Sequence, residues 1–245
     1  MDNDLNENIK VLHKFLNFPI NSSFEILEYF SKFENAISCI NKERQDNFVY
    51  IPGTRQDRVL LLAHCDTVWD KDKNAKQNVI RKENYYVGEN LHFGIGADDR
   101  AGCAILDLLK DSGHSLLILD GEEISSKGAK NIVYNFPKLL KELNNHSYMI
   151  EIDRRNGDDY KCYDIPVTKE FTDFIEFETN YNNAGTMAST DICHLCKKIC
   201  GVNLSVGYYH EHTNNEKLDI LQWDNTLNLL KNMLKKPQKQ YLLKD

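Results

Sequence analysis

Apolar residues recur at two different spacings along the chain. Leu5, Ile9 and Leu12 begin a set spaced three to four residues apart, and Phe24, Leu27 and their successors form a second. This spacing places them on one face of a helix. The same criterion predicts helices over residues 5–17, 23–35, 101–110, 132–143 (interrupted near Pro137), 191–200 and 219–234.

Other segments are apolar at every position, which is typical of strands buried on both faces. Such runs predict strands over residues 59–63, 115–119 and 148–152. Residues 48–51 are expected to pair with 59–63 as a hairpin around Pro52-Gly53. Further strands are expected in 84–93, and a mixed, β-like segment over 160–188. Buried strands alternating with helices predict an α/β fold, a three-layer sandwich with a central mixed, largely parallel sheet between helices.

Composition narrows the class of protein. The 245 residues suffice for one well-buried domain, so we expect a single domain over 1–245. Hydrophobic content is 41% and the net charge is −7. There is no basic block of the kind that grips nucleic acid, and the lysines between 231 and 239 fit a solvated helix end. No apolar run approaches the roughly 20 residues that span a bilayer. Together with an acidic, polar start, this predicts a cytoplasmic protein with no membrane or nucleic-acid partner.

Seven cysteines are scattered through the chain, an odd number that fits free thiols in a reducing compartment. Cys193, Cys196 and Cys200 share one face if residues 191–200 are helical. They therefore fit a small apolar core patch, with a metal or redox site, including the neighbouring His194, as the alternative. Cys65 is expected to pack at a strand end, where it could make a nearby site sensitive to thiol reagents.

Polar residues cluster where the buried strands end. His64 and Asp66 follow the first strand, and Glu122 and Glu123 follow the next. Asp98 lies in the Gly-rich turn Gly96-Ala97-Asp98-Asp99-Arg100-Ala101-Gly102. In α/β folds, reactive groups collect at the loops beyond strand ends.

Two more candidates follow later in the chain. Asp153 ends the third buried strand, and His212 lies in Tyr208-Tyr209-His210-Glu211-His212-Thr213. Imidazole nitrogens and carboxylate oxygens are ligands that zinc accepts. Two divalent metals a few ångströms apart can activate water and stabilise an oxyanion together. The sequence therefore predicts a two-metal hydrolytic site.

These motifs resemble those of the co-catalytic zinc exopeptidases, the superfamily of zinc aminopeptidases, dipeptidases and related deacylases. His64-Cys65-Asp66-Thr67-Val68 matches its His-x-Asp-Thr-Val motif, and the turn from Gly94 to Gly102 matches its second motif. Glu122-Glu123 followed by Gly128-Ala129 matches its third. The resemblance covers nearly the whole chain and implies the three-layer fold predicted above.

The resemblance also implies a role for each residue. His64 and Asp153 would bind one metal, and His212 and Glu123 the other. Asp98 would bridge the two metals. Both would be divalent ions, with Zn²⁺ as the first candidate and Co²⁺ or Mn²⁺ as the alternatives. Glu122 would be the general base that takes a proton from the attacking water and passes it to the leaving amine. Asp66 would hold the His64 imidazole in the orientation that metal binding requires.

Each assignment has a plainer alternative. Asp98 and Asp99 could cap a helix. His210 is the rival of His212, and Asp158 and Asp159 are the rivals of Asp153. Arg154 and Arg155 fit surface ion pairs better than a substrate carboxylate, and Tyr208 and Tyr209 could hold an oxyanion or simply pack. Ser189-Thr190-Asp191 resembles a segment near the family's site and is expected to support the site or the fold rather than to react.

The stretch from Asp153 to His212 is too short for the dimerisation domain that many relatives insert there. The chain therefore resembles the single-domain, aminopeptidase-like branch, acting on short peptides as a monomer or small homo-oligomer. Two other functions remain: an amidase or deacylase of N-acylated small molecules, with the same metal chemistry, and an inactive relative used as a binding module. The chain retains all five predicted ligands and the predicted base, which weighs against the inactive binding module.

Overall fold

The computed structural model describes residues 3–244. The helices are α1 (Asn3–Leu16), α2 (Phe24–Ser31), α3 (Ala97–Leu108), α4 (Lys127–Asn135), α5 (Pro137–Leu143), α6 (Lys169–Thr179), α7 (Asp191–Leu195) and α8 (Ile220–Leu234). The strands are β1 (Ile37–Cys39), β2 (Phe48–Ile51), β3 (Leu60–His64), β4 (Val79–Lys82), β5 (Tyr85–Gly88), β6 (Ser115–Leu119), β7 (Met149–Arg154), β8 (Asp159–Lys161), β9 (Asn182–Asn183), β10 (Gly201–Ser205), β11 (Tyr208–Tyr209) and β12 (Lys217–Asp219).

Eight strands form the central sheet, in the order β1-β2-β6-β3-β7-β10-β8-β9. The middle of the sheet is parallel, from β6 through β3 and β7 to β10. Antiparallel pairs occur at β1-β2, β2-β6 and β10-β8. The sheet is therefore mixed and largely parallel, as the sequence predicts. A second sheet of four strands, β11-β12-β5-β4, lies beside it.

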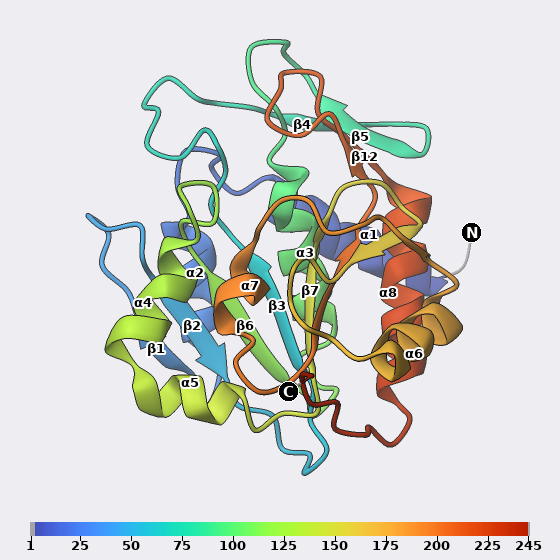
Figure 1. Cartoon of the computed structure of the whole chain (residues 1–245). Helices are drawn as coiled ribbons and strands as arrows, with labels where there is room; N and C mark the ends of the chain where they lie inside the picture. Colours follow the sequence, from blue (N-terminus) through green and yellow to red (C-terminus); the bar gives the residue numbers. More distant parts are fainter. Residues whose placement is uncertain (1–2, 245) are drawn as a thin grey trace.

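Helices cover both faces of the central sheet (Figure 1). Alternate residues of β3 face opposite cores: Leu61 and Ala63 pack into one, and Leu60 and Leu62 into the other. The first core also takes residues from α1, α2, α3, α6 and α8, and the second takes residues from α4, α5 and α7. The three-layer α/β sandwich is confirmed, and the apolar strands are buried on both faces because each face has its own helical layer.

Three local predictions are wrong. Residues 48–51 and 59–63 do not pair as a hairpin, because β6 lies between β2 and β3 and bonds to both. The segment 160–188, expected to be mixed and β-like, is instead built around α6, which Thr168 caps by accepting the Phe171 N–H, and it has only the short strands β8 and β9 near its ends. The helix expected over 191–200 ends at Leu195, so Cys200 instead lies directly before β10.

Because β3, β6 and β7 are parallel, their carboxyl ends meet at one edge of the sheet. His64 ends β3, Asp153 is the second-to-last residue of β7, and the loop after β6 carries Glu122 and Glu123. Within residues 3–244, no helix combines the length and apolar character needed to cross a membrane.

Candidate metal centre

The predicted ligands converge on Asp98. Its Oδ1 lies 3.1 Å from His64 Nε2, which is 3.2 Å from Asp153 Oδ1. Its Oδ2 lies 3.0 Å from His212 Nε2, which is 3.0 Å from Glu123 Oε2. The two oxygens of Asp98 thus face two separate His–carboxylate pairs, the placement that a carboxylate shared between two ions requires.

The cluster holds more buried negative charge than its histidines balance. Burial raises the pKa of Glu122 to about 9 and that of Glu123 to about 7. Hydrogen bonds with Asp98 and Glu123 raise the pKa of His212 to about 11. Carboxylates that resist ionisation beside histidines that retain protons mark a site short of positive charge.

The cluster suits a metal ion chemically. The ligand atoms of His64, Asp98 and Glu123 lie within 4.8 Å of one another, and all three residues are buried or partly buried. Glu123 Oε1 is buried without a hydrogen-bond partner among the described residues, which leaves it free to bind a cation. The imidazole and carboxylate donors match the preferences of Zn²⁺ and related divalent ions.

Glu216 holds Asp98 in place. The buried Glu216 carboxylate accepts the N–H of Ile95 at 2.7 Å, of Gly96 at 2.8 Å and of Asp98 at 3.0 Å. Burial raises the pKa of Glu216 to about 7 in spite of these donors. The helix α3 is not yet regular here, since Asp98 and Asp99 have non-helical dihedral angles. A side chain therefore fixes the turn that presents Asp98.

Asp66 supports the loop after β6. Its two carboxylate oxygens accept the N–H groups of Glu122 and Glu123, each at 3.2 Å. His64 Nδ1 lies 3.1 Å from the Asp66 carbonyl and 3.4 Å from its Oδ1. Asp66 thus links the His64 imidazole to the backbone that carries the predicted base, a connection that the motif alone does not reveal.

Asp153 is held by side chains that the sequence analysis missed or left open. Tyr208 donates its hydroxyl to the Asp153 carbonyl at 2.7 Å, and the Asp153 N–H donates to Asn203 Oδ1 at 3.0 Å. Thr190 donates to Glu151 Oε1 at 2.9 Å and lies 3.3 Å from Asp153 Oδ2. Asn203 and Glu151 are polar residues at fully buried positions of β10 and β7, and this polarity inside buried strands is the sequence signal that could have identified them.

The alternative candidates for the site make other contacts. Asp159 bonds to Arg154, and Arg155 pairs with Glu211 at 2.7 Å, so both arginines form ion pairs. His212, not His210, reaches Asp98.

All seven cysteines are free. Cys196 and Cys200 are buried, Cys193 is half-buried, and the Cys196 thiol contacts Met149 Sδ at 3.7 Å. The apolar packing predicted for this group agrees with that burial, although Cys200 lies outside the helix.

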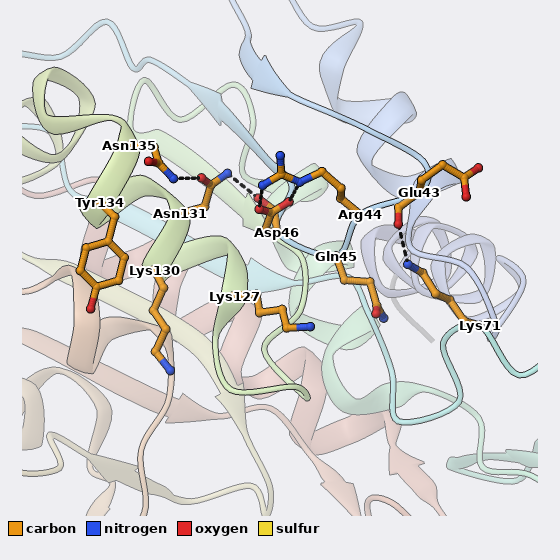
Figure 2. Close-up of a pocket in the computed structure, with 10 residues that line it drawn as sticks. All are labelled: Glu43, Arg44, Gln45, Asp46, Lys71, Lys127, Lys130, Asn131, Tyr134 and Asn135. Atoms are coloured by element: carbon orange, nitrogen blue, oxygen red, sulfur yellow. Dashed lines mark hydrogen bonds and ion pairs between the residues drawn. The ribbon is translucent and has the colours of Figure 1, made fainter.

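A cavity of about 440 Å³ is lined by residues 43–46, by Lys71 and by one face of α4 (Figure 2). It is lined by polar and charged side chains, among them Arg44, Lys127 and Lys130, and includes none of the five predicted ligands. Its wall packs tightly on the loop after β6: Gly121 has a φ of +77°, and a Cβ there would lie 2.0 Å from the Gln45 carbonyl oxygen. Glycine is therefore required directly before Glu122.

No family profile and no curated protein sequence matches the chain. Solved structures do match it along nearly its whole length. The aminopeptidase PepT of Bacillus cereus aligns with a TM-score of 0.69 and 13% identity, over 94% of this chain and 98% of that one. A tripeptidase of Staphylococcus aureus aligns with a TM-score of 0.66 and 12% identity, over 95% and 99%. The TET1 peptidase of Pyrococcus horikoshii aligns with a TM-score of 0.61 and 14% identity, over 93% and 99%. The chain therefore has the fold of the co-catalytic zinc exopeptidases.

Proposed function

We propose that residues 1–245 form one catalytic domain that hydrolyses the terminal peptide bond of short peptides. The reaction would use two divalent metal ions, for which Zn²⁺ is the first candidate. The observation that carries the proposal is the position of Asp98 between the pairs His64–Asp153 and His212–Glu123. The fold shared with solved aminopeptidases and a tripeptidase supports the same conclusion.

In this proposal His64 and Asp153 would hold one ion, His212 and Glu123 would hold the other, and Asp98 would be shared between them. Bound divalent ions supply Lewis acidity towards a carbonyl group and a water molecule. The same donor set accepts Co²⁺ or Mn²⁺, so the metal is to be identified by assay.

Glu122 moves the proton. It accepts a proton from the attacking water and donates it to the leaving amine nitrogen as the amide C–N bond breaks. Its high pKa of about 9 arises first from burial, and added positive charge nearby would lower it towards the range of a general base. Asp66 keeps the Glu122 backbone fixed while the side chain acts.

The choice between a free-amine and an N-acyl substrate is settled by one assay. Metal-loaded protein is given a panel of aminoacyl-anilides and a matched panel of N-acyl amino acids, with Glu122→Gln as the control. We expect cleavage of the free-amine panel, lost in Glu122→Gln. Cleavage of the N-acyl panel alone would make the protein a deacylase. The absence of Glu122-dependent cleavage in both panels would contradict a peptidase and favour a binding module.

A further inference from the structure

The cavity in Figure 2 holds a surplus of positive charge in an acidic chain. Its charged lining residues are four cations and two carboxylates: Arg44, Lys71, Lys127, Lys130, Glu43 and Asp46. Arg44 is already neutralised, because its guanidinium donates to both carboxylate oxygens of Asp46. The three lysines are left with the single carboxylate of Glu43, a surplus of two positive charges, whereas the whole chain has a net charge of −7.

The lysine side chains are not committed to other charged groups. Lys127 and Lys130 lie three residues apart on α4 and make no ion pair within residues 3–244. Lys71 comes from the facing segment and donates to the Glu43 backbone carbonyl at 3.2 Å, a contact that cancels no charge. Figure 2 shows the Lys127 side chain directed from α4 towards Gln45. Like charges that line one hollow repel each other, and a bound anion would relieve that repulsion.

The walls of the cavity are held together by hydrogen bonds. Asn131 of α4 donates its side-chain N–H to the Asp46 carbonyl at 2.8 Å and accepts the Asn135 side-chain N–H at 2.8 Å. Asn47, which follows the lining segment, donates to Asp120 Oδ2 at 2.7 Å. These bonds fix residues 43–47 against α4 and the end of β6. A ligand would therefore enter a preformed site and would lose little free energy to the ordering of the protein.

Charge and size together indicate the class of ligand. A phosphate monoester carries roughly two negative charges at pH 7, which matches the surplus, whereas a single carboxylate carries one. Lysine ammonium groups bind phosphate as point charges. The volume of about 440 Å³ lies within the range of about 300–1,000 Å³ that is typical of small-molecule sites, so an organic group fits beside the phosphate. Tyr134, Asn131 and Asn135 also line the cavity and offer that group an aromatic ring and two amides.

We propose that this cavity binds a dianionic phosphate group carried by a small organic molecule, with Lys71, Lys127 and Lys130 holding the phosphate. None of the five predicted metal ligands lines the cavity, and the inference does not depend on the proposed function. Free phosphate shares the recognised group, and the test distinguishes it from the ester.

The test is isothermal titration calorimetry at low salt with AMP, inorganic phosphate and adenosine as probes. We expect AMP to bind at one site per chain and adenosine not to bind, because adenosine lacks the charged group. Weaker binding of inorganic phosphate than of AMP assigns the site to an ester. Binding of inorganic phosphate as tight as that of AMP would replace the ester with free phosphate.

Substitutions on both walls locate the binding. The double substitution Lys127→Gln and Lys130→Gln should weaken AMP binding about 10-fold or more, since it removes two charge-assisted contacts. Lys71→Gln, on the facing wall, should weaken it as well. The matched control is the double substitution Lys138→Gln and Lys141→Gln, because these lysines are exposed, lie three residues apart on α5 and do not line the cavity. This control should bind AMP as the wild type does.

Thermal unfolding shows whether each variant is folded and gives a second readout. All variants should unfold at the wild-type Tm without ligand. AMP should raise the Tm of the wild type and of the α5 control, and should raise that of the α4 double variant much less, because a ligand stabilises a protein in proportion to its occupancy of the folded state.

Failure of both AMP and inorganic phosphate to bind at millimolar concentration would overturn the inference, and so would three other results. Adenosine that binds as tightly as AMP would show that the phosphate is not recognised. Equal weakening by the α4 and α5 double substitutions would reduce the effect to a general attraction towards surface lysines. AMP binding that persists in the α4 double variant and disappears with a chelator would place the phosphate on the predicted metal centre.

Discussion

Replacing Glu216 with Gln tests whether one side chain holds the turn that presents Asp98. The Glu216 carboxylate accepts three backbone N–H groups, two at Oε2 and one at Oε1. A glutamine can keep its carbonyl oxygen at the first position, which places its NH₂ group against the Asp98 N–H. One hydrogen bond is then lost and two lose the charge that strengthens them.

The cost follows from ordinary magnitudes. A hydrogen bond to a charged group contributes about 1.5–3 kcal/mol, roughly twice as much as a neutral one. Losing one and weakening two costs about 3 kcal/mol. Removing the buried charge, whose burial raises the pKa of Glu216 to about 7, offsets part of that cost, so the free energy of unfolding should fall by about 1 kcal/mol net. For a chain of this size, that corresponds to a Tm lower by roughly 2–4 °C.

The assay is urea and thermal unfolding of metal-free protein at pH 8, where Glu216, with a pKa of about 7, is mainly ionised. Glu122→Gln is the control for a Glu-to-Gln change in the same site, because the described residues give its carboxylate no hydrogen bond. With a pKa of about 9, Glu122 is mainly protonated at pH 8, so this control removes no charge. An unfolding midpoint for Glu216→Gln equal to that of Glu122→Gln would refute the reasoning.

Three further predictions concern the metal ligands, pH and the thiols. Asp66→Asn should weaken metal binding about 10- to 100-fold, measured by competition with a chelator, since it loosens both His64 and the Glu122–Glu123 backbone; unchanged affinity would contradict it. Burial lowers the pKa of His146 from 6.5 to about 4, so the unfolded chain takes up this proton first and stability falls as pH drops through 6.5 towards 4. Wild-type protein should lose about 2 kcal/mol more than His146→Gln between pH 8 and pH 5 in urea titrations, and parallel pH profiles would count against this. Burial also raises the pKa of the Cys65 thiol, which donates to the Leu119 carbonyl; Cys39, which is partly exposed, should react first with a thiol reagent in native protein and Cys65 only after unfolding, as peptide mapping would show.

Much of the fold could be predicted from the sequence because the central strands are apolar at every position. Those runs identify β3, β6 and β7 and require helices on both faces. The order of the strands in the sheet is harder to predict from the sequence. Residues 48–51 and 59–63 are separated by a turn motif, and the pattern does not reveal that β6 would insert between them. Such pairing depends on contacts distant in sequence.

The candidate site shows the same division. His64, Asp98, Glu123, Asp153 and His212 could be named because each lies in a short motif, and the structure brings their side chains together. The residues that support them follow no local spacing. Asn203 reaches Asp153 across 50 positions, and Glu216 reaches Asp98 across 118. Their importance becomes visible only when the buried donors and acceptors are matched.

The most direct measurement titrates metal-free protein with Zn²⁺ in a calorimeter and follows hydrolysis of L-leucine anilide in parallel. The account predicts two equivalents of Zn²⁺ per chain and hydrolysis that appears with metal. Glu122→Gln should bind the same two equivalents without hydrolysis. A protein that binds no Zn²⁺, Co²⁺ or Mn²⁺, or one that cleaves the substrate equally well after chelation, would contradict the account.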